Sequence, residues 1–562
     1  MSDDTQMPGG DSADGHGAPH RRSVLKLGGA TLLAGGVAAT TAAVARPAAT
    51  PAQASAGPAD AVLTADTTVP PDLQSLVPIP SQRIPNAVAK LDSIIKDIMA
   101  RTGVPGLAAA VVHDGKLLYA KGFGVRDVNA KARVNASTVF HLASVSKPLS
   151  STVVAGVVGK KVIKWTDPIV AHLPSFALAD PYVTEHVTYA DLFSHTSGLP
   201  DHAGDLLEDL GYDQAYILNR LRLEPLEPFR AEYAYTNFGL TAAAEAAAAA
   251  AGQSWAGLAD QVLFGPASMP SSSFRNSDFL QHTNRAAMHV KVGKKWVQKY
   301  TRDADPEAPA GGATSNVLDL ANWLMVQLSD GSFEGRPVID TDALEATQLP
   351  RARSGLPSST AARSGFYGLG LNVGPDYAGR VHFSHSGGFD QGAATVINLL
   401  PSENLGIVVL TNGMPLGIPE SVAASFYDYV EAGSKVNDWL GLYGPVFEAM
   451  LVNHSELADK KPPKNPVPAQ PDSYYTGSYA NDYYGSIQIV AKGGSLHLLI
   501  GPGPDDYPLT HWSDNVFSFF PTGENALGIT AATFNPASGG AQASSVTLEY
   551  YNANQLGTFK RL

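Results

Sequence analysis

The residues best suited to chemistry in this sequence are a serine and a lysine three positions apart, Ser144 and Lys147. Pro148 follows at once, and because proline is tolerated only in the first turn of a helix, we expect a helix that begins near Ser144. Ser144 would then lie at the positive end of the helix dipole, with Lys147 on the same face. A serine hydroxyl becomes nucleophilic when a base takes its proton, and a lysine serves as that base if burial lowers its pKa. The apolar stretch 153–158 predicts such burial.

The same Ser-x-x-Lys spacing occurs at two other places, Ser23/Lys26 and Ser93/Lys96. Ser23 belongs to an N-terminal segment that we interpret as an export signal. Ser93 and Lys96 fall between the apolar positions of an amphipathic pattern, so we expect them on the solvated face of a helix. The spacing alone is weak evidence, and it is the context of Ser144 that favours this serine as the nucleophile.

A tyrosine and an asparagine form the second motif, Tyr235-Thr236-Asn237. The Tyr235 hydroxyl is suited to relaying a proton to a leaving group, and the Asn237 amide to orienting a substrate carbonyl while accepting from Lys147. A buried structural tyrosine is the alternative interpretation. The same spacing recurs in a C-terminal region where strands and turns are predicted, at Tyr479/Asn481 and Tyr550/Asn552.

The third motif, His385-Ser386-Gly387-Gly388, is expected to leave a short strand. The edge of such a strand can pair with an extended substrate, and glycines let a substrate approach the backbone closely. We therefore predict that His385, Ser386 and Gly387 bind substrate, and that the amides of Ser144 and Gly388 form an oxyanion hole. A structural histidine beside a strand is the alternative interpretation of His385.

The periodicity of apolar residues predicts the elements that hold these motifs. A helix is predicted over 86–101, and Ala-rich helices surround 242–251 and end at Gly252. Strands are predicted over 107–112, 116–128, 368–373, 382–384, 394–399 and 406–411. A final helix is predicted near 421–429. This order predicts an α/β (α+β) fold in which one antiparallel sheet is flanked by helices.

Composition divides the chain into five segments. Residues 1–54 resemble a twin-arginine export signal, because Arg21 and Arg22 precede a mildly apolar run with small-residue cleavage patterns. We therefore expect an exported protein, periplasmic or secreted, although a run of about 20 residues would also serve as a membrane anchor. Residues 55–80 are predicted to form a linker and residues 81–453 the main domain. Residues 454–472 form a stiff proline-rich linker, and residues 473–562 a small all-β barrel or sandwich.

Composition also excludes several classes of function. The chain has no cysteine, which rules out thiolate nucleophiles and cysteine-ligated metal sites. Its net charge of -13 argues against nucleic acid as a partner, since phosphate binding needs a basic surface. The sequence has no Gly-x-Ser-x-Gly elbow, no His-Glu-x-x-His and no phosphate-binding loop. No metal or cofactor is therefore expected.

In this order, Ser144-x-x-Lys147, Tyr235-x-Asn237 and His385-x-Gly387 resemble the signature of the serine penicillin-recognising enzymes. More narrowly, the chain resembles the class C β-lactamase and D-alanyl-D-alanine carboxypeptidase branch, which also holds esterases and D-aminopeptidases. Segments 192–200 and 310–315 are similar to the same family, and the tail resembles an accessory β domain often appended to such hydrolases. The resemblance implies a β-lactamase/transpeptidase-like fold, and a structural role for His195.

The resemblance implies a serine hydrolase that forms an acyl-Ser144 intermediate, with Lys147 as general base, Tyr235 sharing the proton relay and Asn237 orienting substrate. Its partner would be a small molecule or a peptide, including cell-wall peptide, and the membrane would matter only for export or anchoring. Open alternatives are a D-Ala-D-Ala carboxypeptidase or D-aminopeptidase, a true β-lactamase, a catalytically silent cell-wall-binding protein, and a serine hydrolase on an unrelated fold.

One departure from the family pattern bears on substrate. Many β-lactamases have Lys-Thr-Gly as the third motif, where this chain has His385-Ser386-Gly387. A neutral imidazole holds a substrate carboxylate less strongly than a fixed ammonium does. The sequence also has no clear glutamate that would activate the deacylating water in the class A manner. We therefore expect esters or peptides to be hydrolysed better than β-lactams.

Overall fold

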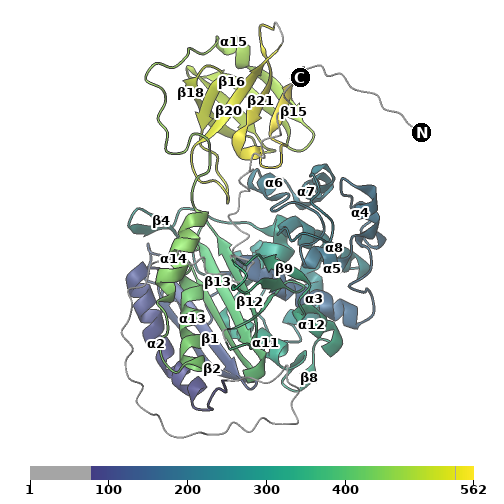
Figure 1. Cartoon of the computed structure of the whole chain (residues 1–562), viewed down its shortest axis with the longest axis vertical. Coiled ribbons are helices and arrows are strands. Elements are labelled where there is room, and N and C mark those ends of the chain that lie inside the picture. The colour runs from purple at the N-terminus through teal and green to yellow at the C-terminus, as the bar shows by residue number, and fades with distance from the viewer. Residues whose placement is uncertain (1–76, 358, 377, 538–539) are drawn as a thin grey trace, which may run out of the picture.

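The computed structural model describes residues 77–562, apart from residues 358, 377 and 538–539. The export signal predicted over 1–54 and most of the linker predicted over 55–80 therefore lie outside the described residues. Within the described part, no helix combines the length and the apolar character needed to cross a membrane. The described chain forms a large α/β body with a C-terminal barrel beside it (Figure 1).

An eight-stranded sheet forms the centre of the body, and every neighbouring pair of its strands is antiparallel. Its order across the sheet is β2 (Lys116–Gly124), β1 (Gly106–His113), β14 (Leu405–Thr411), β13 (Ala393–Leu400), β12 (Val381–Phe389), β11 (Asn372–Pro375), β10 (Gly365–Tyr367) and β9 (Ala352–Gly355). The early hairpin thus joins the late strands in one antiparallel sheet, which confirms the predicted fold class.

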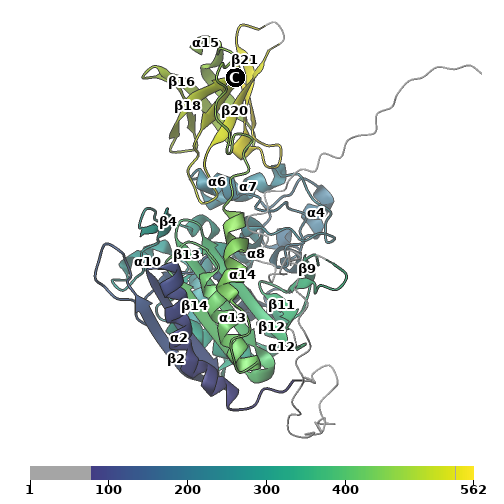
Figure 2. The ribbon, with the colours of Figure 1, turned by 60° about the vertical axis from the view of Figure 1, so that its left-hand side comes forward.

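Both faces of this sheet are buried, and β1 shows why. Because side chains alternate along a strand, Leu107 and Ala109 pack with helices α2 (Arg83–Thr102) and α13 (Ile418–Glu431), while Ala108 and Ala110 face the opposite core. Figures 1 and 2 show α2 and α13 side by side over one face of the sheet. Strands buried on both faces read as continuous apolar runs, as the sequence of β14 does.

The opposite face carries the helical part of the body. Helix α11 (Val317–Leu328) packs on the sheet, and further helices build outward from it (Figure 1). These are α3 (Ser146–Gly159), α4 (Pro181–His186), α5 (Tyr189–Phe193), α6 (Asp205–Asp209), α7 (Gln214–Arg220), α8 (Asn237–Ala250), α9 (Trp255–Ala259), α10 (Asn276–Gln281) and α12 (Thr341–Gln348). Three two-stranded ribbons complete the body: β3 (Phe140–His141) with β6 (Thr314–Ser315), β4 (Val290–Val292) with β5 (Lys295–Val297), and β7 (Ser332–Phe333) with β8 (Arg336–Pro337).

The structure corrects four predicted boundaries. The strand predicted over 116–128 ends at Gly124, and that predicted over 368–373 is wrong because a turn over 368–371 separates β10 from β11. The backbone of Gly370 is left-handed in this turn, with φ of 93°, and packs against the carbonyl of Lys147. The third motif does not leave a strand but lies inside the longer β12. The helix predicted near 421–429 is not the final one, since α14 (Trp439–Met450) follows despite an internal Pro445.

The C-terminal region forms a closed eight-stranded barrel, which confirms the barrel-like β domain. Its strands are β15 (Gly477–Asn481), β16 (Gly485–Lys492), β17 (Ser495–Ile500), β18 (Asp505–Ser513), β19 (Val516–Phe519), β20 (Thr530–Pro536), β21 (Ala543–Leu548) and β22 (Thr558–Arg561). Helix α15 (Asp472–Tyr475) precedes the first strand. The proline-rich segment before it is bound to the barrel, since the Val467 amide donates to Ser513 Oγ at 3.1 Å.

Candidate active site

Ser144 lies in a single 3-10 turn, Ala143–Val145, that leads directly into helix α3. Pro148 occupies the first turn of that helix, as its lack of a backbone N–H requires. The residue before the serine, Ala143, has a left-handed backbone with φ of 47°, a conformation that costs free energy in a residue with a Cβ. Ser144 is partly exposed, whereas Ala143 and Val145 are buried, so the turn presents one hydroxyl from an otherwise closed surface.

Lys147 is completely buried beside this serine. Its Nζ lies 3.1 Å from Ser144 Oγ, 2.7 Å from Asn237 Oδ1 and 3.0 Å from the carbonyl of Ala310. Burial lowers the pKa of Lys147 to about 8, against the opposing effect of the charges of Glu307 and Asp205. A lysine with this pKa has a substantial free-amine fraction near neutral pH and can take the Ser144 proton.

Tyr235 and Asn237 complete the group around the nucleophile. The Tyr235 hydroxyl donates to Ser144 Oγ at 2.8 Å, and burial raises the pKa of Tyr235 above its ordinary value, so the phenol keeps its proton. Lys147 Nζ lies 4.5 Å from the centre of the Tyr235 ring. Asn237 Nδ2 donates to Asp205 Oδ2 at 3.0 Å, which points Asn237 Oδ1 at Lys147. The structure therefore brings Ser144, Lys147, Tyr235 and Asn237 together.

Two residues, Asp201 and His195, hold the Tyr235–Asn237 segment in place through its backbone. The Tyr235 amide donates to Asp201 Oδ1 at 2.7 Å, and the Thr236 amide to His195 Nδ1 at 3.2 Å. The imidazole of His195 is buried behind Tyr235, and burial holds its pKa well below the usual range. The neutral His195 accepts a hydrogen bond from a backbone amide and so supports the segment. No hydrogen bond between His195 and Ser144 is present among the described residues.

The third motif alternates across strand β12. His385 faces the Ser144 side, where its Nε2 lies 2.9 Å from the Tyr367 hydroxyl and its Nδ1 2.6 Å from the carbonyl of Ser386. Because a carbonyl only accepts, Nδ1 carries the proton and Nε2 accepts from Tyr367. Burial lowers the pKa of His385 to about 3, so the ring is neutral and both of its nitrogens are engaged within the protein.

The other residues of the motif lie differently. Ser386 points to the opposite face, where its side chain bonds to Glu420 of α13. Gly387 packs on the nucleophile turn, since a Cβ there would lie 3.0 Å from the Ser144 amide and closer still to the carbonyl of Leu142. Gly388 lines the same cavity as Ser144. Strand β11 pairs with β12 only through Ser384, so the edge beyond that residue has no strand partner in the described sheet.

A cavity of about 400 Å³ opens beside the nucleophile. Ser144, Tyr235, Asn237 and Gly388 line it, whereas Lys147 and His385 lie behind its wall. The opposite wall comes from the barrel, from residues of three of its loops: Tyr483, Tyr484, Glu524, Asn525, Leu527, Tyr550, Ala553, Asn554 and Leu556. The competing Ser93/Lys96 pair is solvent-exposed on α2, and Ser23/Lys26 lies outside the described residues.

Several residues at this site were not singled out from the sequence. Asp205 orients Asn237, and His202 Nδ1 lies 2.6 Å from the same Asp205 Oδ2. Glu307 and Arg302 form part of the cavity wall. Residues 201–209 include four acidic residues, Asp201, Asp205, Glu208 and Asp209. This density of acidic residues is the feature of the sequence that could have pointed to the site.

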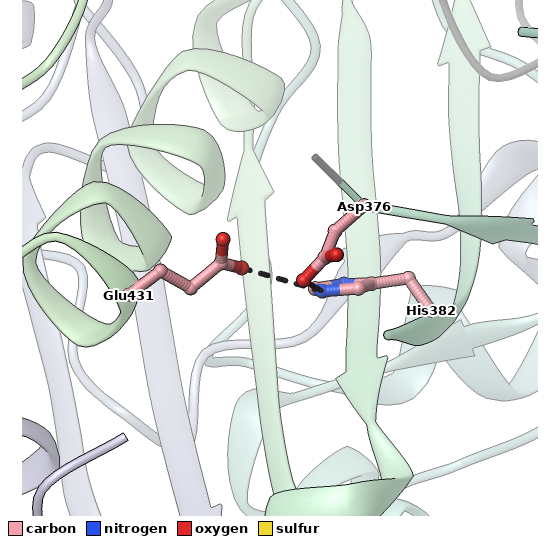
Figure 3. Close-up of side chains that lie close together, drawn as sticks. All are labelled: Asp376, His382 and Glu431. Atoms are coloured by element: carbon pink, nitrogen blue, oxygen red, sulfur yellow. Dashed lines mark ion pairs between the residues drawn. The ribbon is translucent and has the colours of Figure 1, made fainter. Parts of the chain in front are cut away.

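A second histidine cluster lies on the far side of the sheet (Figure 3). His382 Nε2 is 3.4 Å from Glu431 Oε1 and 3.7 Å from Asp376 Oδ2, and Nδ1 is 2.8 Å from Asn398 Oδ1. Hydrogen bonds to the carboxylates of Asp376 and Glu431 raise the pKa of His382 to about 9 in spite of its burial. In this protonated state the imidazole forms ion pairs with both carboxylates.

Comparisons with known proteins show what the chain is similar to. The chain is 24% identical over 443 residues to the unguisins hydrolase ungD of Aspergillus violaceofuscus, covering 70% of this chain and 75% of that protein. It is 23% identical over 337 residues to protein flp of Staphylococcus aureus, covering 58% and 62% respectively. In the tail, residues 461–556 match a domain of unknown function, DUF3471.

Solved structures show the same fold. The octameric penicillin-binding protein homologue of Pyrococcus abyssi aligns with a TM-score of 0.54 at 20% identity, over 82% of this chain and 98% of that one. The class C β-lactamase of Rhodobacter sphaeroides aligns with a TM-score of 0.50 at 20% identity, over 61% and 98%. The β-lactamase family model matches residues 91–425, more than half of the chain, and this protein therefore belongs to the β-lactamase family, whose members are generally serine hydrolases.

Proposed function

We propose that this protein is an exported serine hydrolase that acylates Ser144 with an ester, amide or β-lactam carbonyl and then transfers the acyl group to water. The observation that carries the proposal is the pair of contacts on Ser144 Oγ, from Lys147 Nζ at 3.1 Å and from the Tyr235 hydroxyl at 2.8 Å. One contact supplies a base of lowered pKa, and the other supplies a phenol that keeps its proton.

The acylation step follows from these roles. The free amine of Lys147 takes the Ser144 proton while Oγ forms a bond to the substrate carbonyl carbon. The amides of Ser144 and Gly388 are the proposed donors to the resulting oxyanion. When the bond to the leaving group breaks, Tyr235 gives its proton to that group and recovers one from Lys147. Water then attacks the acyl-enzyme, with the same groups exchanging the proton in reverse.

The neutral state of His385 supports a preference for esters or peptides over β-lactams. Its two ring nitrogens are bonded to Ser386 and Tyr367, so the imidazole offers no positive charge to a substrate carboxylate. A lost charge-assisted contact lowers kcat/KM by about tenfold to a hundredfold. We therefore expect a penicillin to act mainly as an acylating inhibitor, with slow turnover.

Two alternative functions can be compared with the structure. A D-Ala-D-Ala carboxypeptidase or D-aminopeptidase would use the same acyl-Ser144 chemistry, and differs only in the substrate that the cavity accepts. A catalytically silent cell-wall-binding protein would not need the lowered pKa of Lys147, and the intact contacts on Ser144 count against it. Export rests on the sequence of residues 1–54 alone, and retention of the chain inside the cell would contradict it.

Covalent labelling tests the nucleophile. A fluorophosphonate should label the wild type and the Ser93→Ala variant, and Ser144→Ala should lose both labelling and turnover. Mass spectrometry that places the adduct on another serine would show that the assignment is wrong. A panel of D-Ala-D-Ala peptides, D-amino-acid amides, short-chain nitrophenyl esters and a chromogenic cephalosporin then defines the substrate. A cephalosporin kcat/KM near about 10⁸ M⁻¹s⁻¹, close to the diffusional ceiling, would restore a true β-lactamase.

A further inference from the structure

The cavity beside Ser144 is strongly acidic. Among the described residues that line it are one arginine, Arg302, two histidines, His202 and His454, and seven carboxylates: Asp201, Asp205, Glu208, Glu224, Glu307, Asp390 and Glu524. Glu224 is bound by Tyr483 and Asn554 of the barrel, and Asp201 by the Tyr235 amide. The remaining carboxyl groups outnumber the single guanidinium.

Arg302 contacts three of the carboxylates in this region. Its Nη2 donates to Glu208 Oε2 at 2.8 Å and to Glu307 Oε1 at 3.0 Å, and its Nη1 lies 3.9 Å from Asp209 Oδ1. One oxygen of each glutamate is therefore held by the guanidinium. The second oxygens, Glu208 Oε1 and Glu307 Oε2, are buried and have no hydrogen-bond partner among the described residues. The side chains of Glu208 and Glu307 are only 5% and 3% exposed.

The barrel adds a further carboxylate to this group. Its loop between β19 and β20 is fastened to the body at Asp209, which accepts from the Glu524 amide at 2.7 Å and from the Asn525 amide at 3.2 Å. The Asp390 amide binds Glu524 Oε1, and Glu524 Oε2 is buried without a partner. Body and barrel thus each contribute to the wall of one cavity a carboxylate that has a buried, unpaired oxygen.

Such oxygens are costly unless a cation or a proton accompanies them. An unpaired buried carboxylate loses the solvation that water gave it, so it either takes up a proton or binds a positive group. Burial raises the pKa of Glu208, Glu307 and Glu524, and raises that of Asp390 to about 7. These groups are therefore poised to release protons when a cation arrives.

The arrangement of the oxygens favours an organic ammonium over a metal ion. A metal needs ligand atoms that converge on one point, and in the described residues only Asp376, His382 and Glu431 bring such atoms together, on the opposite face of the sheet from His385. Carboxylates spread along a wall suit an ammonium instead, because its three N–H donors can reach separate oxygens.

The acidic wall adjoins the nucleophile. Glu307 directly precedes the π-helical turn Ala308–Gly312, whose Ala310 carbonyl accepts from Lys147. Asp205 adjoins the same machinery through Asn237, and its Oδ1 is also buried without a partner. A positive group held on this wall would lie beside the carbonyl that Ser144 attacks.

We propose that the cavity selects substrates with a protonated amine next to the scissile carbonyl, such as amino-acid esters, amino-acid amides and peptides with a free amino terminus, and that Glu208, Glu307 and Glu524 receive this amine. The inference rests on the proposed serine hydrolase and specifies its substrate class. It also gives the barrel a function, since Glu524 makes selection depend on both parts of the chain.

A matched substrate pair tests the proposal on the full-length protein. Alanine p-nitroanilide and N-acetylalanine p-nitroanilide, in both enantiomers, share the scissile bond and the side chain and differ at the amine, which is charged in the first and a neutral amide in the second. We expect kcat/KM to be at least about tenfold higher for the free amine in the preferred enantiomer, as a charge-assisted contact implies. Glu307→Gln and Glu524→Gln should each reduce this preference, mainly through KM for the free amine.

Glu334→Gln is the control, because that glutamate lies in an exposed ion pair with Arg336, 69% and 65% exposed, and should leave the preference unchanged. Equal kcat/KM for the two substrates, or a preference that survives Glu524→Gln, would overturn the proposal. Fluorophosphonate labelling of Ser144 separates the two levels of inference. A labelled enzyme without amine preference refutes only this selectivity, whereas loss of labelling in the wild type refutes the serine hydrolase itself.

Discussion

His382 and His385 lie three residues apart on strand β12, on opposite faces of the sheet, and differ in charge, since His382 is protonated and His385 is neutral. His382 stands between Asp376 and Glu431, which raise its pKa to about 9, whereas His385 meets only a phenol and a carbonyl, and its pKa falls to about 3. Burial favours the neutral form in both, so the difference comes from the carboxylates. The pair shows that partners, and not depth alone, decide whether a buried histidine is charged.

The two faces of the sheet that carry these histidines are expected to have different roles. On the α13 face, the charged His382 joins β12 to the helix and to the end of β11, and we expect changes there to affect stability. On the Ser144 face, the neutral His385 leaves Lys147 without a second positive charge beside it, and we expect changes there to affect catalysis. Each prediction below acts on one face.

The largest effect is expected from Lys147→Ala on the Ser144 face. Removing the general base should lower kcat by about a thousandfold or more. In the wild type, activity should rise with pH through about 8, because Lys147 must lose its proton to act as base. A pH profile of short-chain ester hydrolysis checks both points, and a variant that keeps the same rising limb would show that another group is the base.

Glu431→Gln on the α13 face should destabilise the fold by about 3 kcal/mol, since it removes one buried partner of a charged histidine. The free energy of unfolding in urea at pH 7 measures this loss. The rate of Ser144 labelling per folded molecule should stay within about twofold of the wild type. Glu334→Gln, at an exposed ion pair, is the control and should cost less than about 1 kcal/mol. A stable Glu431→Gln protein with lost labelling would reverse the assignment of the two faces.

The charge on His382 should make stability fall at alkaline pH. Its folded pKa of about 9 lies above the ordinary 6.5, so its contribution is complete below pH 6.5 and is lost as pH rises through 9. The free energy of unfolding should drop by about 2 kcal/mol between pH 7 and pH 9. His382→Asn should flatten this drop. The same slope in wild type and variant would assign the effect to other groups.

The smallest effect is expected from His385→Gln. Loss of the bond to Tyr367 should lower kcat/KM for a short-chain ester by about tenfold or less. The midpoint of the rise near pH 8 should stay in place, because a neutral imidazole puts no charge beside Lys147. A midpoint that moves by more than about half a pH unit would show that His385 is charged in the working enzyme.

Much of the fold followed from periodicity. Continuous apolar runs mark the early hairpin and the strands near 394–411, and a clear helical stripe marks helix α2. These local patterns were sufficient to predict the elements without knowledge of tertiary packing. Helix α14 was missed because Gly441, Gly444 and Pro445 oppose helix formation, and its packing against α13 overrides them. The turn at 368–371 was missed because its glycines lie between apolar residues that read as one strand.

The candidate site divides in the same way. Ser144, Lys147, Tyr235 and Asn237 came from short motifs, and the structure brings them within hydrogen-bond distance. The acidic wall had no motif, because Glu307 and Glu524 are far apart in sequence and meet only when the barrel docks on the body. The Ala310 carbonyl had no signature at all, since every residue has one. The faces of Ser386 and His385 depended on strand register, which the prediction of a short strand did not give.

The closure of the barrel sets an order for biosynthesis. Strand β15 completes its pairing only with β22, through Tyr479 and Arg561, so the barrel cannot close until residue 561 has been translated. The body, by contrast, is complete in sequence by Met450 and can fold earlier, since domains fold as units during synthesis. A nascent chain therefore has its nucleophile assembled while one wall of the cavity is still unmade. Under the proposed function, substrate selectivity would be the last property that the growing polypeptide acquires, and a chain that stalls before β22 would carry Ser144 in an open, unselective site.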